Sequence, residues 1–327
     1  MEYYERHLKI AKQVGDRAGE GIANGNIGNT YRSLGNFTKA VDCHESCQKI
    51  AKEVGDRATE GRAYGNLGSD FHGMGDFRKA IGYHGSCLEV SKELGDRYGE
   101  GTTYCNLGNA YRCLGKYTKA IDYHERALNV AREIGNKNLE GRAYGNLGKA
   151  YFNLGDFIKS INYQERCLEI ARDVEDRSVE GSAYGNLGST YKDLGDFQKA
   201  IVYQERCLKI AKELNDRSEE GRACGNLGNT YRRLGDFQKA MEFHELNLKI
   251  AREVGDTSEE GSAYSKLGSD YCDLGNFQKA IEYHQQHLKI CKDVGNRAQE
   301  GHIYSKLGIA YFNLGDFEKA KRILHLI

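Results

Sequence analysis

Apolar and small residues recur at helical spacing along this chain, and the whole pattern repeats every 40 residues without an insertion. In the segment 56–95 the first apolar face consists of Ala63, Tyr64, Leu67 and Phe71. This spacing predicts a helix, which Asp56 can cap at its N-terminus and Gly75 can end. A fixed period of this length predicts a stack of similar supersecondary units.

A second helix is predicted in the same repeat. Asp76 can cap it, and Gly95 is well placed to end it in a left-handed conformation. Its expected buried stripe is Phe77, Ala80, Ile81, His84, Cys87, Leu88 and Ser91. Each repeat should therefore form two antiparallel helices of about 27 Å each. Glu175 and Asn215 replace the closing Gly of the other repeats. A left-handed Glu should cost about 1 kcal/mol, so we expect a weak joint or a different turn at Glu175.

The chain divides into segments of constant length. They are 1–15 (a lone second helix), the full repeats 16–55, 56–95, 96–135, 136–175, 176–215, 216–255 and 256–295, and a partial last repeat, 296–327. No Ser-rich or Pro-rich stretch marks a linker, and the chain contains no proline. We therefore expect a single array over residues 1–327.

The repeated motif Tyr-x-Asn-Leu-Gly-x-x-Tyr, as in Tyr184–Tyr191, is followed by Gly-Asp-Phe and Ala. This pattern resembles the tetratricopeptide repeat. Tyr stands at the usual Trp position in six repeats, whereas Asn24 and Cys224 depart from it. The resemblance implies an all-α, right-handed superhelical α-solenoid of antiparallel helix pairs, with roughly 16–17 helices at two per repeat.

The 40-residue unit itself, with Gly-Asp-Arg-x-x-Glu-Gly-Arg-Ala-Tyr-Gly-Asn-Leu-Gly at Gly55–Gly68, is similar to the unit of the Pins/LGN family. It also resembles large cytoskeletal tetratricopeptide scaffolds. The resemblance implies a scaffold in cell polarity, spindle orientation or G-protein signalling. The Gα-binding motifs that follow the repeats in Pins/LGN are not in this sequence, so that activity is not expected.

One Asn position recurs through six repeats: Asn26, Asn66, Asn106, Asn146, Asn186 and Asn226. Each precedes the apolar residue of the Asn-Leu/Ile-Gly phrase, so its side chain should point away from the core. A carboxamide offers a donor and an acceptor, which match the C=O and N–H of a peptide unit. The resemblance implies that the first helices line a concave groove, where such a row of Asn holds an extended chain. The alternative is a set of solvated surface amides.

Cations accompany this row. Arg62, Arg142 and Arg222 lie four residues before the Asn, and Arg32, Arg112, Lys192 and Arg232 lie six residues after it. Lys266 and Lys306 replace the Asn in the last two repeats. We expect these repeats to bind the partner differently, through a terminal carboxylate or acidic side chains of the partner. Only Asp193 and Asp273 oppose these cations on the expected face. Because Arg pairs with carboxylates, we expect acidic peptide segments as partners. The alternative is a solvated helix face.

Three further positions recur, and two of them have two interpretations. The Gly beside the Asn (Gly25, Gly65, Gly145, Gly185 and Gly225) makes room either for a ligand backbone or for a neighbouring helix. The later Gly of the phrase should be a helix contact. A second-helix position holds His44, His84, His124, His244 and His284 but also Gln164 and Gln204, which favours packing over catalysis or metal binding.

Composition narrows the function further. Forty-seven basic and 47 acidic residues give a net charge of zero, which argues against a nucleic-acid partner. No apolar run is long enough to cross a membrane, and no signal segment precedes the first repeat. Ten cysteines form no Cys-x-x-Cys pair. We expect a cytoplasmic protein with no cofactor and no enzymatic activity. The alternative function is a structural module that self-associates through its ends, 1–15 and the run Arg322–Ile327.

Overall fold

The computed structural model describes residues 1–324, which form 17 α-helices. They are α1 (Glu2–Val14), α2 (Arg17–Ser33), α3 (Phe37–Val54), α4 (Arg57–Gly73), α5 (Phe77–Glu93), α6 (Arg97–Cys113), α7 (Tyr117–Glu133), α8 (Lys137–Leu154), α9 (Phe157–Asp173), α10 (Arg177–Leu194), α11 (Phe197–Glu213), α12 (Arg217–Leu234), α13 (Phe237–Val254), α14 (Thr257–Asp273), α15 (Phe277–Asp293), α16 (Arg297–Leu314) and α17 (Phe317–Leu324). The predicted all-α class is confirmed.

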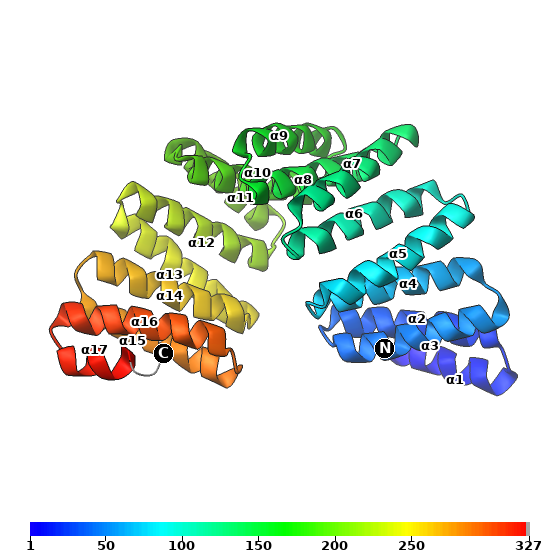
Figure 1. The fold of residues 1–327 in the computed structure, drawn as a ribbon, viewed down its shortest axis with the longest axis horizontal. Coiled ribbons are helices and arrows are strands. Elements are labelled where there is room, and N and C mark those ends of the chain that lie inside the picture. Colours follow the sequence, from blue (N-terminus) through cyan, green and yellow to red (C-terminus); the bar gives the residue numbers. More distant parts are fainter. Residues whose placement is uncertain (325–327) are drawn as a thin grey trace. The chain divides into compact units, whose positions relative to one another are not determined.

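These helices belong to two compact bodies. The N-terminal body is Met1–Glu175, with α1 to α9, and the C-terminal body is Asp176–Ile327, with α10 to α17. Within each body every helix packs on the next, as the ribbon shows (Figure 1). First helices of successive repeats also meet, as α4 meets α6 and α12 meets α14. This is the consecutive helix-pair packing of a tetratricopeptide solenoid.

The predicted helix ends are those observed. The Asp56 carboxylate accepts from the Thr59 N–H at 2.9 Å, and Asp76 accepts from the Lys79 N–H at 3.1 Å. Gly95 closes the repeat with φ +66°. Lys116 is an exception, because it precedes α7 without a side-chain cap.

Glu175 and Asn215 adopt the same left-handed conformation as the closing glycines, with φ 57° and 53°. The expectation of a different turn at Glu175 is therefore wrong, and the strain remains in the usual turn. The division between the two compact bodies falls directly after Glu175.

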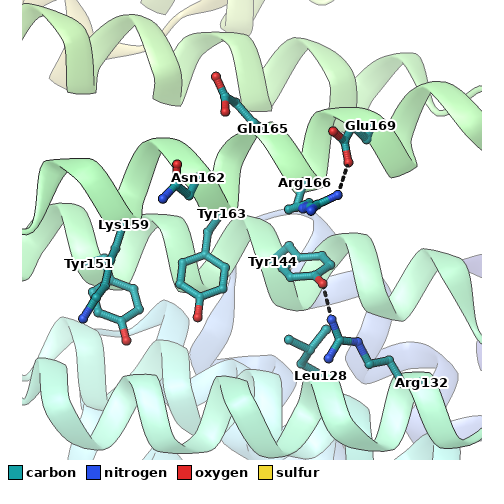
Figure 2. A pocket seen from close by; sticks show the side chains of 10 residues that line it. All are labelled: Leu128, Arg132, Tyr144, Tyr151, Lys159, Asn162, Tyr163, Glu165, Arg166 and Glu169. Carbon is teal, nitrogen blue, oxygen red and sulfur yellow. Dashed lines mark hydrogen bonds and ion pairs between the residues drawn. The ribbon is translucent and has the colours of Figure 1, made fainter.

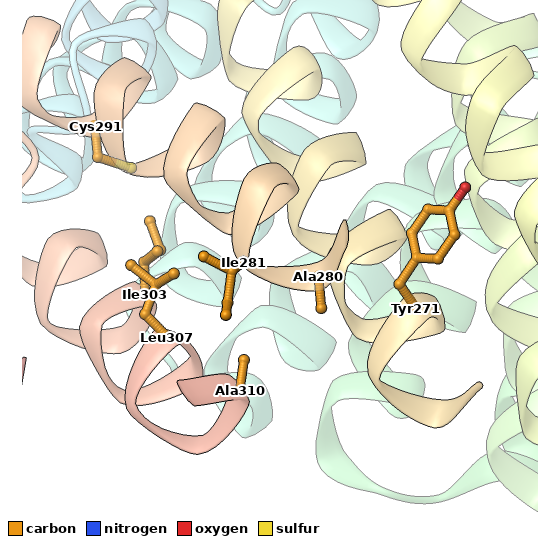
Figure 3. Close-up of a cluster of buried hydrophobic side chains, with 7 residues drawn as sticks. All are labelled: Tyr271, Ala280, Ile281, Cys291, Ile303, Leu307 and Ala310. Atoms are coloured by element: carbon orange, nitrogen blue, oxygen red, sulfur yellow. The ribbon is translucent and has the colours of Figure 1, made fainter. Parts of the chain in front are cut away.

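Ala and Leu of the repeated phrases form the core. In the C-terminal body one cluster joins Ala280 and Ile281 of α15 to Ile303, Leu307 and Ala310 of α16 (Figure 3). In the repeat 56–95, Ala63, Leu67 and Phe71 are buried as predicted, while Tyr64 is half-buried. Most of the second-helix stripe is only half-buried, and Val90, which the stripe omitted, is buried.

In the seven full repeats the later Gly of the phrase is a helix contact, as expected. A Cβ added at Gly28 would lie 2.6 Å from His44 Nε2, and one at Gly68 would lie 2.5 Å from His84 Nδ1. Gln164 packs in the same way on Gly148. Since His44 and His84 are buried against these glycines, the packing interpretation of the His position is confirmed.

The Gly beside the Asn also faces its own second helix. A Cβ at Gly65 would lie 3.3 Å from Cys87 Sγ, and one at Gly145 would lie 3.2 Å from Cys167 Sγ. In the repeat 96–135 the larger side chain of the pair is on the first helix and the smaller one on the second. These residues are Cys105 and Ala127, and both are buried. This size compensation supports the neighbouring-helix interpretation over the ligand-backbone one.

Candidate functional site

The predicted Asn row lies on the first helices of both bodies. Asn26, Asn66, Asn106 and Asn146 belong to the N-terminal body, and Asn186 and Asn226 to the C-terminal body. Five of the six are half-buried and Asn146 is 9% exposed, so they are not freely solvated amides. Arg32 Nη1 donates to Asn66 Oδ1 at 3.3 Å, which couples one repeat to the next.

A hollow of about 650 Å³ in the N-terminal body brings three predicted residues together. Arg62 and Asn66 reach it from α4, and Asn106 reaches it from α6. Gly65, Cys87 and Val90 also line it, with Tyr98. Polar and cationic groups therefore share this hollow with an apolar surface.

The predicted cations differ in their surroundings. Arg62 and Arg142 are exposed, and neither forms an ion pair within the described residues. The Arg62 guanidinium donates to Thr59 Oγ1 at 2.8 Å, and half-buried Arg112 donates to Asn153 Oδ1 at 3.4 Å.

Other predicted cations are already paired. Arg222 pairs with Glu219, Lys266 Nζ lies 3.0 Å from Glu259 Oε1, and Lys192 Nζ lies 3.3 Å from Asp193 Oδ1. Arg232 Nε lies 2.6 Å from Asp273 Oδ2. The sequence-based count of opposing acids was thus too low, because Glu219 and Glu259 had been left out.

Two buried carboxylates on the same helices were also missed. Asp70 is 0% exposed; its Oδ2 lies 2.5 Å from His44 Nδ1, and its Oδ1 lies 3.6 Å from Arg32 Nη1. Asp270 repeats this arrangement with His244 and Arg232 at 2.5 and 3.5 Å. His and Asp stand 26 residues apart in both cases, a spacing that could have revealed the pair. Arg32 and Arg232 are therefore held by their own chain.

A second hollow, of about 510 Å³, lies in the C-terminal body. Lys192 and Arg232 line it with Arg233, Asp193 and Asp273, so its cations face acids. Lys306 differs: its Nζ donates to the hydroxyls of Ser265 and Ser269 at 2.8 and 3.3 Å. Burial, followed by the charge of Arg232, lowers the pKa of Lys306.

A larger cavity, about 1050 Å³, opens beside α7, α8 and α9 (Figure 2). Tyr144, Tyr151 and Tyr163 line it, and none of the predicted site residues does. Two of its arginines already have partners, since Arg132 donates to Tyr144 and Arg166 pairs with Glu169 (Figure 2). We therefore take the N-terminal hollow, not this cavity, as the candidate site.

The Gly-Asp-Arg-x-x-Glu phrase has a structural role that the sequence did not reveal. Arg57 pairs at 2.7 Å with both Glu60 of its own turn and Glu93 near the end of the second helix. Arg97 and Arg217 repeat this double pairing. The Arg thus joins the two ends of a helix pair, and an Arg with a Glu 36 residues later was the available signal.

Two searches of the described residues were negative. Over 1–324, no three His, Cys, Asp or Glu side chains gather as a metal site would require. None of the helices in this part of the chain has the length and apolar character needed to span a bilayer. No disulfide bond joins any of the ten cysteines, all of which lie within the described residues.

The tetratricopeptide repeat model matches seven overlapping stretches: 20–93, 59–133, 99–173, 139–213, 179–253, 220–290 and 259–324. The chain belongs to the tetratricopeptide repeat family. Arrays of this family are interaction scaffolds for other proteins, and this chain is a scaffold of that kind.

Mouse G-protein-signaling modulator 1, a protein of the Pins/LGN group, is 58% identical over 40 residues. The human protein of the same name is 59% identical over 39 residues. Each match covers 12% of this chain and 6% of the relative. The resemblance to the Pins/LGN unit is confirmed over one repeat length, and the chain matches only a small part of those proteins.

Solved structures share the fold. The apo form of the quorum sensor NprR from B. thuringiensis has a TM-score of 0.70 at 18% identity, covering 99% of this chain and 96% of that one. A Rap protein complexed with Competence and Sporulation Factor has a TM-score of 0.63 at 15% identity, covering 94% and 96%. At these identities the likeness concerns the fold alone.

Proposed function

We propose that this protein is a non-enzymatic scaffold that binds extended, acidic segments of other proteins on its first helices. The observation that carries the proposal is the convergence of Arg62, Asn66 and Asn106 on one hollow. Each amide can pair with the donor and acceptor of one peptide group, independently of the side chain that the peptide presents. The guanidinium adds a charged fork that fits a carboxylate.

The spacing of the repeats suits an extended ligand. Packed helices lie about 8–10 Å apart, and an extended chain advances about 3.3 Å per residue. Each repeat would thus meet about three residues. In the N-terminal body the first and the last Asn of the row stand three repeats apart. The four Asn would therefore hold on the order of 10 residues of the peptide. Arg62, Arg142 and Arg112, which lack acidic partners among the described residues, supply its positive charge.

One solved structure with a similar fold and one sequence relative are consistent with such a role. The Rap structure contains a Competence and Sporulation Factor bound to a similar fold. G-protein-signaling modulator 1 carries a similar repeat and is named for G-protein signalling. We propose a cytoplasmic role in polarity, spindle or G-protein signalling for this chain, acting as a single array.

The test is fluorescence anisotropy with a labelled 12-residue acidic peptide. Asn66→Ala with Asn106→Ala should weaken binding by about tenfold or more, at about 1 kcal/mol per hydrogen bond lost. Affinity should also fall as salt rises. Asn162→Ala, an exposed second-helix site, is the matched control and should change nothing. Equal affinity of the double variant and the wild type would refute the amide row.

Self-association is the competing function. On α1, Tyr3 and Val14 are 86% and 71% exposed. Of the C-terminal run that was predicted to self-associate, residues 325–327 lie outside the described residues. Light scattering over a concentration series measures this directly. A mass that rises with concentration, together with absent peptide binding, would favour the structural module.

A further inference from the structure

The hollow beside Arg62 has an apolar floor. Val90, which is 2% exposed, and the half-buried Cys87 thiol line it from α5. Gly61 and Gly65 line it from α4 and pack closely on these two side chains, since a Cβ would lie 2.8 Å from Val90 Cγ1 and 3.3 Å from Cys87 Sγ. A surface of this kind binds an apolar side chain better than it binds water, because burial removes apolar area from solvent.

The size of the side chain at position 102, which lines this hollow, differs between repeats. Thr102 stands where the repeats 56–95, 136–175 and 216–255 carry Arg62, Arg142 and Arg222. A short side chain at 102 leaves space above Cys87 and Val90 that a long one would occupy. Thr102 lines the hollow, and its buried Oγ1 has no hydrogen-bond partner within the described residues.

An exposed aromatic ring borders the same space. Tyr98 is 54% exposed and lies in the first turn of α6. The equivalent positions of the other repeats hold only small or polar residues: Ala18, Ala58, Asn138, Ser178, Ser218, Ser258 and Ala298. A solvent-facing ring beside an open apolar floor is a surface that gains from contact with a partner.

We propose that this hollow seats one large apolar side chain, of the size of Leu, Ile, Met or Phe, from an extended acidic segment of a partner protein. This inference rests on the proposed function, since Asn66 and Asn106 hold the backbone of the same segment. Arg62 lines the hollow as well, so a carboxylate should lie within about three residues of the apolar one. The apolar seat then selects among acidic segments that the amides alone would bind equally.

The experiment uses the full chain and a family of labelled 12-residue peptides. The parent contains only acidic residues and Ser, and one Leu is moved through each position in turn. Burying one Leu should tighten binding by about tenfold over the parent at one or two positions. Equal affinity for all peptides would overturn the inference and leave the acidic-peptide function intact.

Thr102→Arg is the decisive variant. It introduces the Arg that three other repeats carry at this position, so it should fold normally. It fills the hollow while adding positive charge. We expect the Leu preference to disappear, although the parent peptide binds as well as before or better. Ser182→Arg, the same change at the equivalent exposed position of α10, should keep the preference.

Two other outcomes count against the inference. If Thr102→Arg retains the Leu preference, the apolar seat lies elsewhere. If no peptide binds and light scattering shows that Tyr98→Ser dissociates a dimer, the hollow is occupied by a second copy of the chain, and the proposed function fails with the inference. Circular dichroism of each variant confirms that the helices are unchanged.

Discussion

Acid should destabilise this protein through three buried histidines that have no carboxylate partner among residues 1–324. Burial lowers the pKa of His84 to about 4, of His124 to about 3 and of His284 to about 4. Nearby positive charges act in the same direction: His72 on His84, Arg112, Arg142 and Lys149 on His124, and Lys306, His287 and His302 on His284.

The direction follows from linkage. Each folded pKa lies below the unfolded value of about 6.5, so between the two the unfolded chain binds more protons. Stability is therefore complete above about pH 7 and is lost as the pH falls through 6.5 toward the folded pKa. At pH 5 each histidine should remove about 2 kcal/mol, and the three together about 6 kcal/mol.

The matched replacement is already in the sequence. Gln164 and Gln204 occupy the same position and pack on the same glycine of the phrase. The variant His84→Gln, His124→Gln, His284→Gln should therefore fold at pH 7 and lose much less stability at pH 5. Urea unfolding followed by circular dichroism at both pH values measures the difference. An equal loss in wild type and variant would show that these side chains do not titrate as their burial requires.

Three further tests concern packing, a helix cap and a left-handed turn, and each is measured by urea unfolding. Gly145→Cys alone should lower the free energy of unfolding by about 1–3 kcal/mol through overpacking. Adding Cys167→Ala should restore most of the loss, because the pair then matches Cys105 and Ala127. If the effects of the two substitutions simply add, the size compensation is refuted. Lys116→Asp should stabilise by about 1 kcal/mol by capping α7 as Asp76 caps α5, and no gain would mean that the end of α7 is satisfied otherwise. Glu175→Gly should stabilise by about 1 kcal/mol by relieving a left-handed Glu, and Asn215→Gly by less, so a reversed order would contradict the strain.

The helices could be predicted from the sequence because their determinants are local and repeated. Asp56, Gly75 and Gly95 act within one turn of where they stand, so period and caps suffice to place the ends. The candidate site was predicted only in part. Asn66 and Asn106 were found because an Asn recurs at their position in six repeats.

The state of each cation could not be predicted, because it depends on contacts between repeats. Nothing near Arg32 in the sequence indicates Asp70, which lies on the next first helix. Lys266 pairs with Glu259 of its own helix, whereas Lys306 donates to hydroxyls of the preceding first helix. The hollow was missed for the opposite reason. Position 102 varies between repeats and Tyr98 has no aromatic counterpart in them, and a search for recurring residues passes over such positions.

The buried pairs that link one repeat to the next limit how such a gene can gain or lose repeats. His44 meets Asp70, Gln204 meets Thr230, and His244 meets Asp270, always 26 residues apart. Recombination that excised residues 216–255 would set Gln204 against Asp270, leaving a buried carboxylate without its His. Excision of 96–135 would instead set His84 against Ala150, which keeps the kind of neighbour that Ala110 now supplies. Repeats of equal length are therefore not interchangeable, and only some junctions should survive duplication or deletion.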